Sequence, residues 1–176
     1  MAHDTDIEGA DAPLPTSPDE LLAFLAAHGI EARTHRHPPL FTVEESKALR
    51  GELPGGHCKN LFLKDKKGQL WLVVALEDTD VDLKRLDKRI GSARLSFGRA
   101  DLLREVLGVR PGSVTPFALV NDRERSVRVV LERRMMEHDI LNYHPLCNDR
   151  TTAVASRDLL KFLAATGHEP LVADLD

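Results

Sequence analysis

A lysine inside an apolar run is the first residue whose surroundings could support chemistry. On a strand, Lys59 shares one face with Leu61 and Leu63, because side chains alternate between the two faces. An ammonium at the rim of an apolar pocket can hold a phosphate or a carboxylate, although a strand-end lysine can equally extend its charge to water. The pair Gly55–Gly56 precedes this lysine and would let a ligand approach the backbone closely.

A second candidate is a short loop with glycine at one end and proline at the other. Its residues are Gly112, Ser113, Val114, Thr115 and Pro116. Such a loop can present consecutive backbone N–H groups to an oxyanion or a phosphate. A plain connecting turn has the same composition, so both interpretations stay open. The glycine triad and the GK[ST] sequence typical of nucleotide-binding loops are absent.

A histidine in the run Tyr143–Asp149 is the third candidate. His144 can serve as a general base, as a hydrogen-bond anchor, or as a loop histidine whose ring nitrogens are simply satisfied. Asn148 and Asp149 are first of all residues typical of a turn before a strand. The residue types alone do not choose among these roles.

Metal binding and cysteine chemistry find little support. A zinc site would have to draw on scattered side chains, namely His35, His37, His57 and Cys58, and neither cysteine has a second one at ligand spacing. Cys58 should share a strand face with Phe62, and a buried cysteine is usually inert, so neither Cys58 nor Cys147 is expected to act as a nucleophile. We therefore expect no metal ion and no cofactor.

The elements that position these residues follow from caps and periodicity. Ser17, Pro18 and Glu20 form a capping box that opens a helix ending at Gly29, and Thr42 opens a second helix that ends by Gly51. Further helices are expected over residues 81–90, 99–107 and 157–166, the last capped by Ser156, and strands over 32–35, 58–64, 69–76, 117–120, 127–132, 151–155 and 170–172. Hairpins lie between helices, which predicts an α+β domain with one mixed, largely antiparallel sheet flanked by helices.

Composition limits the broad class of protein. A chain of 176 residues favours one domain, which we place at residues 16–176 after a disordered acidic tail at residues 1–15. The formal net charge is −4, but removing the six acids of residues 1–20 leaves 22 acidic residues against 24 basic ones. No apolar run is long enough to cross a membrane, and no signal peptide or disulfide framework is evident, so a cytoplasmic location is expected.

Four segments, taken together and in this order, resemble one family. They are His37–Thr42 with Glu44 and Glu45, then Gly55–Asp65, Gly112–Phe117 and Tyr143–Thr152. They resemble the upstream stretch, the lysine-bearing strand, the GxxxP loop and the histidine motif of the YbaK-type deacylases, also called prolyl-tRNA synthetase-associated domains. The resemblance covers the chain from about residue 17 to its end. Segments like those that carry synthetase catalysis or anticodon binding are not found, so we expect the editing module alone.

Within that superfamily the chain looks most like the free-standing branch that clears Ala-tRNA(Pro). The sequence of Cys58–Phe62 and the His-Pro-Leu-x-Asn-Asp run favour this branch over the one that acts on Cys-tRNA(Pro). Cys147 stands where threonine is common, which leaves His144 in register. The resemblance implies a trans-editing hydrolase that cleaves the aminoacyl ester to free alanine and tRNA. Its implied partners are the acceptor end of tRNA(Pro) and, transiently, prolyl-tRNA synthetase.

The resemblance also implies roles for individual residues. Lys59, His144 and Gly112 would form the catalytic set, in which the lysine holds the phosphate of the terminal adenosine and the histidine helps to position the substrate. The family implies help from the substrate's own ribose hydroxyl, so neither the lysine nor the histidine is assigned as the general base. The remaining substrate-binding residues would be Phe41, Thr42, Asn60, Ser113, Val114, Thr115, Pro116, Asn148 and Asp149. Three alternatives stay open: a different aminoacyl-tRNA such as Cys-tRNA(Pro), a catalytically silent module that binds an RNA end or an amino acid, and a metal hydrolase.

Overall fold

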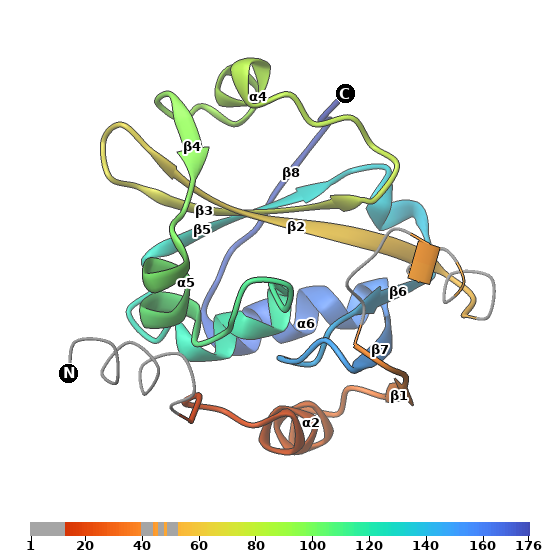
Figure 1. Ribbon diagram of the computed structural model, residues 1–176. Coiled ribbons are helices and arrows are strands. Elements are labelled where there is room, and N and C mark those ends of the chain that lie inside the picture. The colour runs from red at the N-terminus through yellow and green to blue at the C-terminus, as the bar shows by residue number, and fades with distance from the viewer. Residues whose placement is uncertain (1–12, 40–43, 46–47, 49–52) are drawn as a thin grey trace.

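The fold centres on one mixed sheet. The computed structural model describes residues 13–39, 44–45, 48 and 53–176. Within this part of the chain, eight strands form a sheet in the order β1-β7-β6-β2-β3-β5-β8, and β4 pairs with β2 beside that path (Figure 1). The strands are β1 (Ala32–Arg36), β2 (Gly56–Asp65), β3 (Leu70–Leu76), β4 (Leu95–Phe97), β5 (Val127–Glu132), β6 (Ile140–Tyr143), β7 (Arg150–Ala155) and β8 (Leu171–Ala173). Antiparallel pairs join β1–β7, β6–β7, β2–β3 and β2–β4, whereas β2–β6, β3–β5 and β5–β8 are parallel. The predicted fold class is confirmed.

Helices cover both faces of this sheet. On one face, α2 (Pro18–Ala27), α5 (Ala100–Leu107), the 3-10 helix η1 (Pro116–Asn121) and α6 (Ser156–Thr166) pack over a large apolar cluster that includes Phe62 and Cys58. On the other face, α4 (Leu83–Ile90) packs over a smaller cluster that includes Leu61 and Leu63 (Figure 1). The alternation predicted for β2 is therefore confirmed, and it divides even-numbered from odd-numbered residues between the two clusters.

The predicted helix ends agree with the structure in most places. Ser17 and Glu20 form the reciprocal capping box of α2, with hydrogen bonds of 3.1 and 3.0 Å. Gly91 and Gly108 end α4 and α5 in the left-handed conformation that glycine adopts without a steric penalty. For α6 the predicted cap is wrong, because Ala155 occupies the cap position and Ser156 is the first helical residue. The predicted helix after Thr42 lies largely outside the described residues.

The strand predicted over residues 117–120 is wrong. This segment belongs to η1, which begins at Pro116 and is capped by the Thr115 hydroxyl accepting from the Phe117 N–H. Phe117, Ala118 and Leu119 are all buried, so the run has no polar face to reveal its period. A short, wholly apolar run fits a buried strand and a buried helix equally well. Strands β4 and β6 and the 3-10 helix η2 (Met135–Glu137) were not predicted.

One edge of β2 is shared by two different partners. The first part of the strand pairs with β6, where His57 lies opposite Asn142, and the last part pairs with β4, where Leu63 lies opposite Phe97. Among the described strands, none pairs with Cys58–Leu61 on this edge. Sheets commonly bind ligands where neighbouring strands separate in this way.

The described chain begins before α2 and contains no membrane-crossing candidate. Pro15 lies against Gly108, and the Thr16 hydroxyl donates to the Asn121 side chain at 2.6 Å. The disorder predicted for residues 1–15 stays a prediction for the residues before these contacts. No helix among the described residues combines the length and the apolar character needed to cross a bilayer.

Candidate functional site

Lys59 and His144 lie at the same level of the sheet. The parallel register pairs His57 with Asn142; Lys59 lies two residues further along β2, and His144 lies two residues further along the chain, just after the end of β6. At this level β6 has ended and β2 continues alone on that edge. The lysine ammonium does not point to the histidine, because it donates a hydrogen bond to the Thr79 carbonyl oxygen. An ammonium has three N–H donors, so this contact leaves donors for a ligand.

Asn60 presents a buried polar atom without a partner. Its Oδ1 is buried, and no described residue donates a hydrogen bond to it. The residue lies opposite Val74 on the face that carries Cys58 and Phe62, so Lys59 and Asn60 lie on opposite faces of the same free edge. An unsatisfied buried amide oxygen costs about 1–3 kcal/mol, so this oxygen is a candidate acceptor for a donor of a ligand or for a water.

The loop Gly112–Pro116 lies on the face of the sheet that carries Asn60. Val114 packs against the same apolar cluster as Cys58 and Phe62, and Ser113 and Thr115 are buried. Gly112 has φ of +90°, a left-handed conformation that explains the glycine. Of the loop amides, the Ser113 N–H donates to the Arg110 carbonyl oxygen at 3.0 Å. Within the described chain, the N–H groups of Val114 and Thr115 donate to no protein acceptor.

The His144 side chain is held as a neutral imidazole with one nitrogen free to accept. Burial lowers the pKa of His144 and the charge of nearby His37 lowers it further, while the hydrogen bond with Arg150 opposes both. Nδ1 lies 3.0 Å from the Arg150 carbonyl oxygen, which can only accept, so this nitrogen carries the proton. Nε2 of the neutral ring therefore keeps its lone pair and can accept from a hydroxyl or a water.

The segment after His144 is tightly fixed. Leu146 is buried and has φ of +68°, which is a strained conformation for a bulky residue and recurs at functional sites. The Asp149 carbonyl oxygen accepts from the His37 N–H at 3.0 Å, and the rings of His37 and His144 lie 6.4 Å apart. Asn148 is half-buried in the same turn. The turn and strand-start role that the sequence assigned to Asn148 and Asp149 agrees with their position just before β7.

The two cysteine thiols are shielded by burial, and the space beside the glycines before Lys59 is filled by other residues of the protein. Burial raises the pKa of Cys58 to about 12 and that of Cys147 to about 11, so both thiols are protonated at neutral pH and are poor nucleophiles. The expectation that a ligand approaches Gly55–Gly56 is wrong. A Cβ on Gly55 would lie 2.7 Å from the Ile140 carbonyl oxygen, so this close approach belongs to β6.

The side chains considered for zinc have other partners. His37 pairs with the Pro38 carbonyl oxygen at 2.8 Å and the Thr151 hydroxyl at 2.9 Å, and His57 pairs with the Leu53 carbonyl oxygen at 3.0 Å. Among the residues that the structure describes, no group of three or more histidine, cysteine, aspartate or glutamate side chains is arranged to hold a metal ion.

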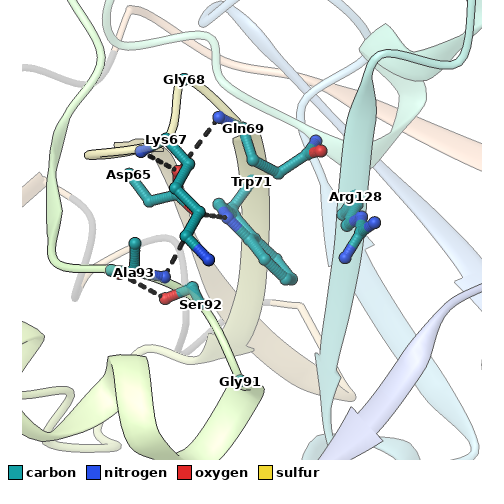
Figure 2. Close-up of a pocket in the computed structure, with 9 residues that line it drawn as sticks. All are labelled: Asp65, Lys67, Gly68, Gln69, Trp71, Gly91, Ser92, Ala93 and Arg128. Atoms are coloured by element: carbon teal, nitrogen blue, oxygen red, sulfur yellow. Dashed lines mark hydrogen bonds between the residues drawn. The ribbon is translucent and has the colours of Figure 1, made fainter.

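An open pocket of about 500 Å³ lies at the other end of the β2–β3 hairpin. It is lined by Asp65, Lys67, Gly68, Gln69, Trp71, Gly91, Ser92, Ala93 and Arg128 (Figure 2). The Asp65 carboxylate accepts from the N–H groups of Lys67 and Gln69 at 2.9 and 3.0 Å, from the Trp71 indole at 3.1 Å and from the Ala93 N–H at 3.3 Å. Its polar groups serve the hairpin itself, so we assign this pocket a structural role.

The expected site residues are divided between the two faces of the sheet. By strand alternation Asn60 lies on the face where Val114 and Leu146 pack, and Lys59 lies on the opposite face. His144 follows directly after β6, which pairs with the start of β2. Phe41 and Thr42 lie outside the described residues. Thr79, whose carbonyl oxygen accepts from Lys59, was not predicted as a site residue, and His37 was predicted as part of a motif without a role beside His144. No local pattern marks Thr79, since its contact arises from the turn after β3.

Known proteins resemble this chain in fold and in sequence. A solved structure described as that of a candidate trans-editing enzyme for prolyl-tRNA synthetase matches with a TM-score of 0.68 at 18% identity, covering 92% of this chain and 99% of that one. A Danio rerio protein described as prolyl-tRNA synthetase associated domain-containing protein 1 is 42% identical over 159 residues, covering 89% of this chain and 86% of that protein. Prolyl-tRNA editing protein ProX of Acetoanaerobium sticklandii is 38% identical, covering 75% of this chain and 81% of that protein.

These likenesses define the class of protein. The sheet and its helical layers form an editing-domain fold. Residues 37–162 match the sequence profile of the aminoacyl-tRNA editing domain. The chain belongs to this family, in the branch associated with prolyl-tRNA synthetase.

Proposed function

We propose that the chain is a trans-editing hydrolase that deacylates Ala-tRNA(Pro), releasing alanine and tRNA. The observation that carries the proposal is the buried, unpartnered Oδ1 of Asn60 at the free edge of β2, beside Lys59 and at the level of His144. The α-ammonium of an aminoacyl group is a donor that would satisfy this oxygen. The names of the relatives, which refer to prolyl-tRNA synthetase and to prolyl-tRNA editing, support the choice of tRNA.

A small pocket suits the chemistry of error correction. A synthetase site shaped for proline cannot exclude the smaller alanine by size, because each missing methylene changes binding by only about 1–3 kcal/mol. A second site that admits alanine and rejects proline supplies the remaining discrimination. Val114, Ser113 and Thr115 lie in the loop that we assign to this pocket.

The reaction is the hydrolysis of an ester. Water adds to the carbonyl carbon, the bond from that carbon to the ribose oxygen breaks, and one proton of the water ends on the ribose oxygen. We assign the developing oxyanion to the N–H groups of Val114 and Thr115, which have no acceptor within the described chain. The free Nε2 of His144 accepts from a hydroxyl of the terminal ribose or from the water and so fixes its position.

The remaining roles concern the grip on the RNA end. Lys59 donates to the phosphate of the terminal adenosine with the N–H groups that Thr79 leaves free. Asn148 and Asp149 support the His144 turn, and Phe41 and Thr42 are assigned to substrate binding from the family resemblance alone. Transient contact with prolyl-tRNA synthetase and a cytoplasmic location also stay predictions.

The experiment is a hydrolysis panel with four substrates: Ala-tRNA(Pro), Cys-tRNA(Pro), Pro-tRNA(Pro) and Ala-tRNA(Ala). The wild type is compared with Lys59→Ala and with Lys64→Ala, a matched change of an exposed lysine on the same strand. We expect selective loss of alanine from Ala-tRNA(Pro), slowed about 100-fold by Lys59→Ala and kept by Lys64→Ala. If cysteine were released from Cys-tRNA(Pro) faster than alanine from Ala-tRNA(Pro), the substrate would be Cys-tRNA(Pro). If none of the four substrates were hydrolysed, a catalytically silent binding module would be the better account.

A further inference from the structure

The turn that holds Lys59 is itself anchored by a buried carboxylate. Residues 76–79 form the turn that leaves β3, closed by the Thr79 N–H donating to the Leu76 carbonyl oxygen at 3.1 Å. The Thr79 carbonyl oxygen then accepts from the Lys59 ammonium. Lys59 lies opposite Ala75 on the neighbouring strand, so its side chain reaches the turn along the end of β3.

Glu132 fixes both ends of this turn. It ends β5, the parallel neighbour of β3, and is only 1% exposed. Its carboxylate accepts from the Leu76 N–H at 2.9 Å, and its two oxygens lie 2.9 and 2.7 Å from the Thr79 hydroxyl. Arg134 partly balances the buried charge, with its Nε 3.8 Å from the carboxylate. A carboxylate this deeply buried is costly unless it is hydrogen-bonded, so its three contacts define one geometry for the turn.

We propose that Glu132 is a positioning residue for Lys59, acting through Thr79. The proposal rests on the proposed function, because it needs Lys59 to bind the substrate. A free lysine side chain loses about 2 kcal/mol of rotamer entropy when it is fixed on a ligand. Holding the ammonium on a rigid carbonyl removes part of that loss before the RNA end arrives. The network therefore favours substrate binding without touching the substrate.

The test compares Glu132→Gln with Asp122→Asn. The control removes the charge of an equally buried, hydrogen-bonded carboxylate that holds Ser126, Val127 and His168 instead. We expect Glu132→Gln to lower kcat/KM for Ala-tRNA(Pro) by at least about tenfold, since a 1 Å displacement of a positioning group costs about 100-fold. The loss should fall on the same kinetic parameter as in Lys59→Ala. Asp122→Asn should lower the melting temperature similarly and change kcat/KM less than about threefold.

A double-mutant cycle separates positioning from general damage. In a Lys59→Ala background, Glu132→Gln should lower kcat/KM no further, because the group that it positions is gone. Should Glu132→Gln fail to fold, Thr79→Val and Thr79→Ser replace it. The valine removes the hydroxyl at nearly constant volume and should reproduce the loss, whereas the serine keeps the hydroxyl and should retain activity.

The outcomes also separate this inference from the proposed function. The positioning role of Glu132 would be overturned if the double variant lost kcat/KM by the product of the two single losses, or if Glu132→Gln and Asp122→Asn were equally active. In either case the role of Lys59 in substrate binding would stand. If Lys59→Ala itself had no effect on hydrolysis, the fault would lie with the role assigned to Lys59 in the proposed function.

Discussion

The two ends of the β2–β3 hairpin treat their polar groups in opposite ways. At the turn end, the two oxygens of the Asp65 carboxylate accept from four protein N–H groups, beside an open pocket of about 500 Å³. At the open end, Asn60 Oδ1 is buried and has no donor within the described chain. The two ends therefore differ in whether their buried polar atoms have protein partners, and this difference is the reason why we propose the open end as the site of chemistry.

The largest expected effect is at the turn end. Asp65→Ala leaves N–H groups of Lys67, Gln69, Ala93 and the Trp71 indole without their acceptor, and should lower the free energy of unfolding by about 3 kcal/mol. Chemical denaturation measures this loss. The variant that remains folded should hydrolyse Ala-tRNA(Pro) at the wild-type rate, and a large loss of rate without unfolding would erase the contrast between the two ends.

Lys59→Ala should show the reverse pattern. The change removes the proposed phosphate ligand and should lower kcat/KM by about 100-fold. It removes one hydrogen bond to Thr79, so the free energy of unfolding should change by about 1 kcal/mol or less. Steady-state kinetics and denaturation on one preparation give both numbers. Destabilisation as large as that of Asp65→Ala would mean that Lys59 is structural.

Asn60→Ala sharpens the comparison further. The change removes a buried oxygen that has no protein donor, so the free energy of unfolding should stay within about 1 kcal/mol of wild type or rise. Hydrolysis should still fall by about tenfold, because the substrate loses an acceptor. A clear loss of stability would show that Asn60 serves the fold, as Asp65 does.

The smallest effect near neutrality concerns pH. Burial, and to a smaller extent His37, lower the pKa of His144 below its ordinary value of 6.5, so its ring is mostly neutral at neutral pH. The log of kcat/KM should be level around neutral pH and should fall in acid as the ring protonates and Nε2 stops accepting. His144→Gln should abolish this acidic limb. A limb that begins above pH 7 would contradict the neutral-imidazole role.

At the turn end, acid should change the stability of the fold and not the rate of hydrolysis. Burial by itself would raise the pKa of Asp65, but the hydrogen bonds from Trp71, Gln69, Lys67 and Ala93 outweigh it and lower the pKa. A lowered pKa means that the carboxylate stabilises the fold above its unfolded pKa near 3.8 and loses this contribution as pH falls through the folded value. Asp65→Asn should therefore flatten the dependence of unfolding free energy on pH in acid, as measured by denaturation at several pH values.

Local patterns predicted a large part of the fold. The Ser17–Glu20 capping box, the hairpin about residues 65–68 and the alternation that separates Lys59 from Cys58 are all encoded within a few residues of chain. The 117–120 segment failed because a fully apolar run does not reveal its period. Strand β6 was not predicted because four residues, one of them the exposed Ile140, are too few to show a periodic hydrophobic pattern. Its pairing with β2 also joins segments more than 80 residues apart.

The site was predictable only in its outline. Family motifs singled out Lys59, His144 and the Gly112–Pro116 loop as candidates, whose roles stay predictions, and their arrangement depends on strand pairing between distant segments. The contact of Glu132 with Thr79 joins residues 53 positions apart and exists because β5 lies parallel to β3. That Asn60 Oδ1 lacks a donor is a property of the packed structure, and no residue type or spacing could reveal it.

The most direct test of the account is to map where an aminoacyl-adenosine end binds. The probe is an alanyl-adenosine analogue with an amide in place of the ester, titrated into isotope-labelled protein and followed by NMR. We predict that the amide signals of Lys59, Asn60, Val114, Thr115 and His144 shift together, while those of Lys67, Gln69 and Ala93 stay in place. Shifts confined to the residues around Asp65 would contradict the account, because they would place the substrate at the end of the hairpin whose polar groups are already satisfied.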